Sequence, residues 1–223
     1  MRTPQEPHAT NRQPDPPSTG PSAMDTVRLR RLNRWQAEQL QEDLADLYVE
    51  SSAGPPGKDF HRREEFLHRL AETVQQPGFD MLVAESTVLD GCVYGFPVGR
   101  DGSWWEGFDG QLPHKLEQLT ASGHVFAITE TLVHPHGHAT GLAHRLHRHL
   151  LADHHASLGV TSVDTTDRTT LDAFLPWGWQ EVGRMHRPPP GAGTSRVLVL
   201  ALGERTAEHP DGLTHNDRTQ RPA

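Results

Sequence analysis

The chain is short of cysteine, and this shortage removes several classes of protein. Cys92 is the only cysteine among 223 residues, so no disulfide can form within the chain. Zinc sites and iron–sulfur clusters that need several thiolates are excluded for the same reason. Because such a composition is typical of a reducing compartment, we expect a cytoplasmic location.

Long apolar runs and dense basic runs are also missing. No eighteen consecutive residues are apolar, and the polar, proline-rich N-terminus lacks the apolar segment of a secretory signal. The net charge is −8 with histidine counted as neutral, and no cluster of lysine or arginine indicates a nucleic-acid interface. We therefore expect neither a membrane nor a nucleic acid among the partners.

The two ends of the chain differ in composition from its middle. Residues 1–23 are rich in proline and residues 205–223 are polar, so both segments are predicted to be disordered tails. Residues 24–204 have the composition and length of one ordinary domain. Met24 stands where the first tail stops, which makes it a second candidate translation start beside Met1.

Hydrophobic periodicity predicts the element order β-α-α-β-β-β-α-β-α-β within this domain. The predicted strands are 27–32, 81–85, 92–98, 124–133, 160–164 and 196–202. The predicted helices are 34–51, 60–75, one that is marked by Leu142, Leu146 and Leu150 and ends near Gly159, and 169–174. Because strands outnumber helices and hairpins are mixed with a crossover helix, we expect an α+β fold with a mixed sheet and helices on both faces.

The most informative segment is a strand, a turn of small residues and the start of an amphipathic helix. The turn and helix start read His138-Ala139-Thr140-Gly141-Leu142-Ala143. At such a junction, backbone N–H groups without a helical partner and the positive end of the helix dipole attract an anion. The lysine of a Walker loop and the three glycines of the dinucleotide fingerprint are both absent, which disfavours ATP and NAD. The segment therefore predicts a cradle for another diphosphate.

These residues resemble the cofactor motif of the GCN5-related N-acetyltransferase (GNAT) family, Gln/Arg-x-x-Gly-x-Gly/Ala after a strand ending in Val-x-Pro. Val133-His134-Pro135 and residues 138–143 match it in order and spacing. A later segment, residues 167–179, resembles the family's Asn-x-x-Ala-x-x-x-Tyr-x-x-x-Gly-Phe. The resemblance extends over the element order from 27 to 202. It implies a mostly antiparallel sheet, splayed at a cofactor cleft, in an acyltransferase for groups other than amino-acyl.

The resemblance also implies roles for individual residues. The cofactor would be acetyl-CoA with no metal, its pyrophosphate held by residues 138–143 and its pantetheine arm by N–H groups of Leu132 and Val133. His138 stands where relatives have glutamine or arginine. Phe174 stands at the cofactor where many relatives have a tyrosine that protonates the departing thiolate, so that acid is absent here.

Glu130 is the candidate catalytic base. A protonated amine has no lone pair with which to attack a thioester, so a base is required, and in the resembling family a glutamate on this strand often provides it. Burial in an apolar strand would raise the pKa of Glu130. Strict alternation places Glu130 on one face with Phe126, Ile128 and Leu132, so either it reaches a cleft or the register is distorted there.

Three aromatic residues, Tyr94, Trp104 and Trp105, are candidates for binding the acceptor, although core packing explains them as well. We expect the acceptor to be a small amine or an aminoglycoside-like metabolite, and a homodimer is the candidate assembly.

Two other functions stay open. Because the tyrosine is missing at Phe174, the chain is also a candidate for a non-catalytic coenzyme A-binding or regulatory module. His134, His136 and His138 suggest a histidine-rich metal-binding protein. Their positions across a turn, without an acidic or thiol ligand at a fixed offset, weigh against a metal site, and we expect none.

Overall fold

The structure is a computed structural model, and it describes residues 27–51, 59–135, 139–187 and 193–203. The predicted tails at 1–23 and 205–223 and the residues Met24, His136 and His138 lie outside these ranges.

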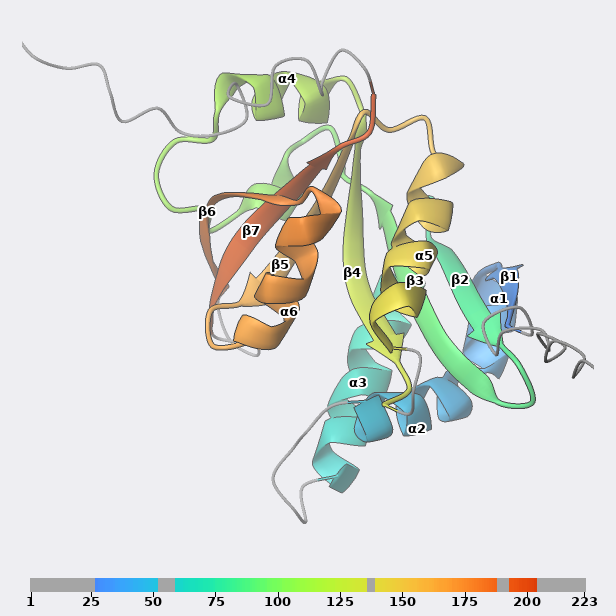
Figure 1. Cartoon of the computed structure of the whole chain (residues 1–223). Coiled ribbons are helices and arrows are strands. Elements are labelled where there is room, and N and C mark those ends of the chain that lie inside the picture. The colour runs from blue at the N-terminus through green and yellow to red at the C-terminus, as the bar shows by residue number, and fades with distance from the viewer. Residues whose placement is uncertain (1–26, 52–58, 136–138, 188–192, 204–223) are drawn as a thin grey trace, which may run out of the picture.

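Seven strands form one sheet in the order β1-β2-β3-β4-β5-β7-β6 (Figure 1). The strands are β1 (Arg28–Leu32), β2 (Asp80–Glu85), β3 (Leu89–Pro97), β4 (Val125–Val133), β5 (Leu158–Asp164), β6 (Gln180–Arg187) and β7 (Gly193–Ala201). The β4–β5 pair is parallel, and the other neighbouring pairs are antiparallel. The prediction of a mixed, mostly antiparallel α+β sheet is thereby confirmed.

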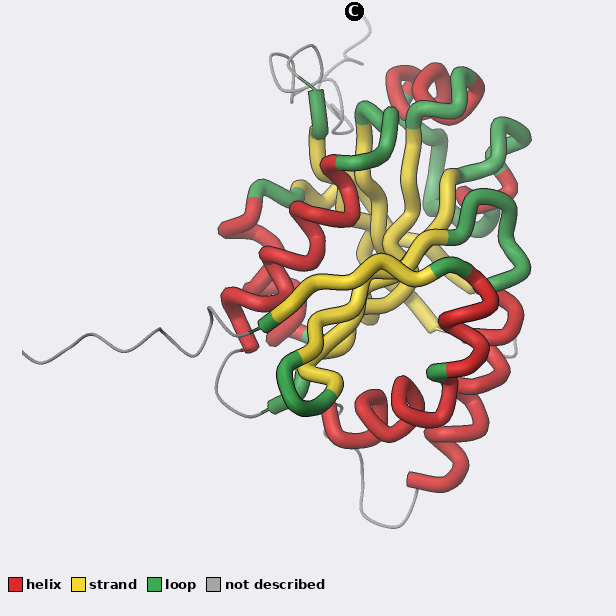
Figure 2. The backbone as a smooth tube through the Cα atoms, turned by 90° about the vertical axis from the view of Figure 1, so that its right-hand side faces the viewer, coloured by secondary structure: helices red, strands yellow, loops and turns green. Residues whose placement is uncertain are grey.

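Helices cover both faces of the sheet (Figure 2). They are α1 (Arg34–Gln39), α2 (Gln41–Ser51), α3 (Asp59–Thr73), α4 (His114–Ala121), α5 (Ala139–Ala152) and α6 (Arg168–Phe174), with short 3-10 turns at η2 (Ser103–Trp105) and η3 (Leu175–Trp177). One core lies under α5 and α6, and two lie on the opposite face, under α1–α3 and under α4. Apolar burial on both faces is the main stabilising contribution to such a layered fold.

The structure differs from the predicted elements at four places. Helix α4 and strand β6 were not predicted, and β6 is an edge strand with largely polar residues, which weakens its apolar pattern. The single helix predicted over 34–51 is two helices with a turn at Leu40. Helix α5 ends at Ala152, and Gly159 lies inside β5, where its missing side chain leaves room for Leu151 and Trp179.

A β-bulge interrupts the pairing of β3 with β4. Tyr94 pairs with Glu130, but the next residue, Gly95, pairs with Ile128, so Thr129 is an extra residue in β4. Gly95 permits this close approach, because a Cβ at that position would lie 1.9 Å from the carbonyl oxygen of Ala127.

The bulge reverses which face of the sheet the later residues of β4 occupy. Phe126 and Ile128 belong to the core under α5, whereas Leu132 belongs to the core under α2 and α3. Glu130 pairs with Arg69 of α3 and so lies on the Leu132 side. Strict alternation from Phe126 was therefore wrong for Glu130, and the alternative of a distorted register is confirmed.

Strands β4 and β5 run side by side only at their beginnings. Residues Val125, Phe126 and Ala127 pair with 158–160, and the Thr161 hydroxyl donates to the carbonyl oxygen of Ile128 at 3.0 Å. Within the described ranges, no later residue of β4 pairs with β5, and the two strands separate (Figure 1). The second half of β4 therefore has an open edge beside β5.

Replacing Gly95 by alanine should destabilise the fold, because the new methyl group would collide with the Ala127 carbonyl at the bulge. We expect the free energy of unfolding in urea to fall by about 3 kcal/mol. Gly203→Ala is the matched control, since nothing lies within 4 Å of a Cβ there, and it should change stability by less than about 0.5 kcal/mol. Equal stability of the two variants would contradict the close approach.

Candidate functional site

The open edge of β4 presents backbone groups toward β5. The N–H of His134 donates to the carbonyl oxygen of Asp90 at 2.8 Å, which fixes His134 as a residue facing β3. Because successive N–H groups of a strand point to opposite sides, Leu132 also faces β3 and Val133 and Thr131 face the open edge. Of the two N–H groups predicted to bind pantetheine, only that of Val133 has this orientation.

Glu130 lies on the α3 side of this half-strand. Its Oε2 is 3.5 Å from Nη2 of Arg69, and about 24% of its side chain is exposed. Burial raises the pKa of Glu130 above its ordinary value, although the Arg69 guanidinium and the backbone N–H of Thr131 act in the opposite direction. A partly buried carboxylate with a raised pKa and a solvent-facing edge has the properties of a general base.

Tyr94 pairs with Glu130 from the neighbouring strand but is nearly fully buried. Burial, followed by the charge of Glu130, raises the pKa of Tyr94 well above its usual value. The phenol is therefore protonated at neutral pH and belongs to the core under α2 and α3. Because its side chain is buried, Tyr94 offers almost no surface to an acceptor, and its role in acceptor binding stays a prediction.

Helix α5 begins at Ala139, so residues 139–142 contribute the N–H groups of its first turn. Gly141 is exposed at the surface of this turn, Leu142 is buried and Ala143 is half-buried. No acidic residue lies in the first turn to repel an anion. Ala139 and Thr140 are thus at the predicted helix start, while His138 falls outside the described residues.

A buried histidine connects α5 with β4 and α6. His147 is 1% exposed, and its Nε2 lies 2.8 Å from the Thr131 hydroxyl. Its ring also contacts Phe174 edge-on, with the centroids 5.1 Å apart. Burial, with a smaller contribution from His144, lowers the pKa of His147 to about 3, so the imidazole is neutral at physiological pH.

Phe174 lies in an aromatic wall that also contains Trp177 and Trp179. His144 of α5 stacks on Trp177 of η3 with centroids 5.1 Å apart, so the aromatic wall at the end of α6 and in η3 contacts α5. Two buried polar atoms in this wall, Nδ1 of His147 and Nε1 of Trp179, have no hydrogen-bond partner among the described groups. Such atoms are rare, and each one calls for an explanation.

The two tryptophans predicted to bind the acceptor lie elsewhere. Trp105 is buried in the core under α4, and its indole N–H donates to the Thr120 hydroxyl at 3.0 Å. Trp104 is half-buried and packs edge-on against it. These contacts give Trp105 a packing role, whereas Tyr94 is the one of the three that adjoins Glu130.

Arg69 and His147 were not identified as functional residues from the sequence. Arg69 is one of several arginines on α3, and nothing in its local pattern marks it as the partner of a residue on β4. His147 stands among many histidines of α5, and only its place in the Leu142, Leu146, Leu150 side of the helix could have indicated burial.

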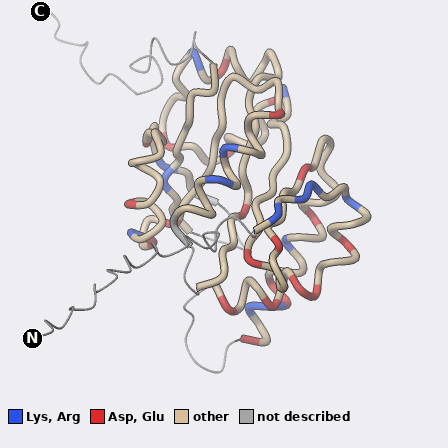
Figure 3. Tube along the Cα trace, turned by 45° about the vertical axis from the view of Figure 1, so that its right-hand side comes forward, with Lys and Arg blue, Asp and Glu red and all other residues tan. Residues whose placement is uncertain are grey.

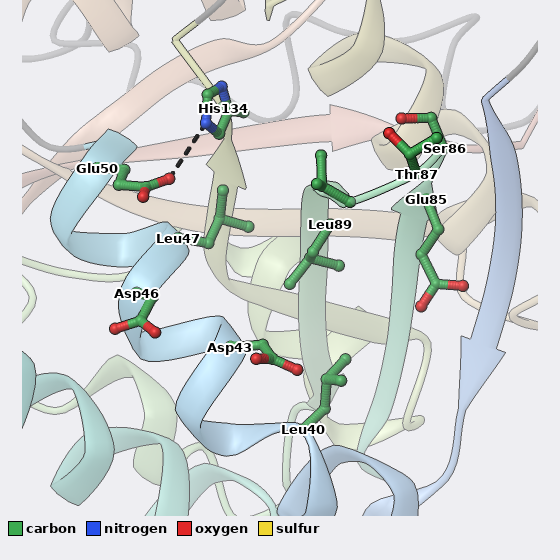
Figure 4. A pocket seen from close by; sticks show the side chains of 11 residues that line it. Leu40, Asp43, Asp46, Leu47, Glu50, Glu85, Ser86, Thr87, Leu89 and His134 are labelled. Carbon is green, nitrogen blue, oxygen red and sulfur yellow. Dashed lines mark ion pairs between the residues drawn. The ribbon is translucent and has the colours of Figure 1, made fainter.

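A separate hollow of about 570 Å³ lies between α2 and the β2–β3 turn (Figure 4). Its lining includes Asp43, Asp46 and Glu50, and Glu50 points toward His134 with 3.1 Å between Oε2 and Nε2. Acidic and basic positions are interspersed along the nearby helices (Figure 3), and Arg63 pairs with Asp46. Glu130 is not in its lining, so this hollow is distinct from the open edge of β4.

No described helix has the length and hydrophobicity needed to cross a bilayer. In the described ranges, no three histidine, cysteine, aspartate or glutamate side chains are grouped as metal ligands would be.

The sequence has no match to any protein-family model or to any curated protein sequence. Solved structures do match. A GNAT-family protein from Desulfovibrio desulfuricans has a TM-score of 0.53 at 14% identity, over 79% of this chain and 99% of that chain. Aminoglycoside 6'-acetyltransferase type Ii has a TM-score of 0.53 at 13% identity, over 78% and 96%. A PaiA N-acetyltransferase from Thermoplasma acidophilum, solved with coenzyme A, has 0.50 at 9%, over 79% and 99%.

These matches assign the architecture to an α+β class with a mixed sheet that separates between its two parallel strands. More particularly, the chain has the GNAT fold, and the resemblance found in the sequence is confirmed at that level.

The depressed pKa of His147 predicts that the free energy of unfolding decreases as the pH falls below 6.5. The unfolded imidazole binds a proton below its ordinary pKa of 6.5, whereas the folded one resists protonation down to about 3. Its contribution is therefore complete above pH 6.5 and is lost as the pH falls toward 3. In urea unfolding at pH 7 and pH 5, His147→Gln should lose less stability on acidification than the native chain, by at most about 1.4 kcal/mol per pH unit.

His149→Gln is the matched control, since His149 is exposed on the same helix. It should follow the native pH dependence. If His147→Gln followed it too, His147 would not be held neutral by burial.

Proposed function

We propose that this protein is an N-acetyltransferase that moves an acetyl group from acetyl-CoA to the amine of a small molecule, without a covalent enzyme intermediate. The observation that carries the proposal is Glu130, a carboxylate of raised pKa beside the open edge of β4, within a GNAT fold.

The residues at the separation of β4 and β5 fit coenzyme A. Residues 139–142, at the start of α5, offer N–H groups and a helix dipole to the pyrophosphate, with Gly141 leaving the approach open. The N–H of Val133 is available to the pantetheine arm. The neighbouring Leu132 has its N–H toward β3 and its side chain in the core under α2 and α3, so it would contribute by holding this part of β4 in place. Nδ1 of His147, which has no hydrogen-bond partner in the described part of the chain, is a further polar group close to Phe174. His138 completes the proposed pyrophosphate contacts.

Acetyl-CoA supplies a thioester carbonyl that an amine can attack. Glu130 would take the proton from the acceptor's ammonium group, directly or through a water, and so expose the lone pair. The N–H groups on the open edge of β4 would stabilise the negative charge that develops on the carbonyl oxygen. Direct transfer needs no nucleophile from the protein, and the buried Cys92 is not suited to be one, because burial raises its pKa.

The departing thiolate has no tyrosine to protonate it. The Phe174 ring has no acidic proton to donate. The neighbouring imidazole of His147 is neutral, because burial lowers its pKa. Water or the proton released from the acceptor is therefore the source in our proposal, and a thiolate is stable enough to leave without a strong acid.

We propose a small amine as the acceptor. An aminoglycoside 6'-acetyltransferase is among the proteins with this fold, which supports an acceptor of that size and charge. The acceptor would approach from the α2 and α3 side, where Glu130 lies next to Tyr94. A contribution of Trp104 from its half-buried position, a cytoplasmic location and a homodimer remain predictions.

A carboxylate at position 141 should weaken cofactor binding strongly, because it would both block and repel the pyrophosphate at the start of α5. For Gly141→Glu, calorimetry should give an affinity for acetyl-CoA about a hundredfold lower than native, equivalent to about 2.7 kcal/mol. His149→Glu places the same charge near the other end of the helix and should bind as the native chain does. Absence of binding to the native chain would remove the proposal altogether.

Loss of the base should slow the chemical step more than it weakens binding. In a screen of small amines with acetyl-CoA, Glu130→Gln should lower kcat by about 10²- to 10⁴-fold while leaving acetyl-CoA affinity unchanged. If acetyl-CoA binds but no amine is acetylated by the native protein, the chain is instead the non-catalytic coenzyme A-binding module that Phe174 suggests.

A further inference from the structure

Arg69 is the described cation that faces Glu130. It projects from α3, and its guanidinium lies 3.5 Å from the Glu130 carboxylate. The guanidinium also lies over the ring of Tyr48, with Cζ 5.3 Å from the ring centroid. Tyr48 is itself stacked on the buried Phe66, with centroids 4.7 Å apart. The stack of Tyr48 on Phe66, which is part of the core under α2 and α3, therefore holds the Arg69 guanidinium in position.

The other groups around Glu130 give it no positive charge. Tyr94 and Cys92, on β3, are both buried with raised pKa values and are neutral at physiological pH. Tyr48, on α2, presents its ring to the guanidinium. Glu130 thus experiences two opposing influences, burial that favours the protonated form and Arg69 that favours the carboxylate.

We propose that Arg69 is a positioning residue for the acetyl transfer, which holds the Glu130 carboxyl group ionised and oriented beside the open edge of β4. This inference rests on the proposed function for its catalytic consequence. Without the guanidinium, burial would act with less opposition and raise the pKa of the carboxyl group further. A larger fraction of Glu130 would then be protonated at a given pH, and a protonated carboxyl cannot accept a proton from the acceptor. Removal of Arg69 therefore impairs the base without touching the cofactor.

Arg62 offers a matched control on the same helix. Its guanidinium lies over the same Tyr48 ring, with Cζ 5.6 Å from the centroid, but it pairs with the carboxylate of Asp59 at 3.3 Å. Arg62→Met therefore removes a cation and an aromatic contact of the same kind while leaving the Arg69–Glu130 pair in place.

The first readout is the titration of Glu130 itself. Carbon-13 NMR of protein labelled at glutamate carboxyl carbons would follow Glu130, which Glu130→Gln identifies. Arg69→Met should raise the pKa of Glu130 by about one unit, Arg69→Lys should leave it near the native value, and Arg62→Met should not move it. Arg69→Gln serves as a second neutral variant if Arg69→Met does not fold. An unmoved Glu130 pKa in a folded neutral variant overturns the proposal.

The second readout is the pH dependence of kcat/KM with acetyl-CoA and an amine that the native protein acetylates. The acid limb should move to higher pH by about one unit in Arg69→Met, giving about a tenfold loss on that limb, with recovery in Arg69→Lys. An unchanged acid limb overturns the catalytic role. If the native protein acetylates nothing, the proposed function fails, while the NMR titration still decides whether Arg69 controls the ionisation of Glu130.

Discussion

The close contact of Gly95 with the backbone at Ala127 governs the arrangement of the candidate site. Because β3 approaches so closely there, β4 accommodates an extra residue, Thr129, and every residue after it changes face. Glu130 is thereby turned toward α3 and Thr131 toward His147 of α5. One bulge thus divides β4 into a first half that only packs and a second half that presents polar groups to both helical layers.

The charge on Glu130 depends on two layers of the fold at once. The sheet contributes burial through the neutral neighbours on β3, and α3 contributes the positive charge of Arg69. Neither contribution alone produces a useful base, because a fully desolvated carboxyl stays protonated and a fully paired one binds protons weakly. The packing of α3 against Tyr48 therefore supports the proposed chemistry as well as the core.

The sequence predicted the parts of this site that depend on local pattern. The strand ending at Val133, the helix with Leu142 and Leu146 on its buried side, and the small residues between them follow from periodicity and spacing. The bulge does not, because it arises from an approach between two strands, and alternation alone assigned Glu130 to the wrong face. Arg69 was missed for the same reason, since ion pairs between distant elements leave no local signal.

Phe174, at the position where the resembling family often has a tyrosine, has polar neighbours within an aromatic wall. The Phe174 ring contacts His147 and stacks on Trp179. Nδ1 of His147 and Nε1 of Trp179 have no hydrogen-bond partner among the residues that the structure describes. Two unpaired polar atoms buried in one aromatic wall are costly in an isolated protein, and a ligand with hydrogen-bonding groups would relieve that cost. In the proposed function, phenylalanine at position 174 provides no acid, while the polar atoms of the wall would still be able to bind a polar arm of the cofactor. Cofactor binding and catalysis are therefore separable parts of the proposal.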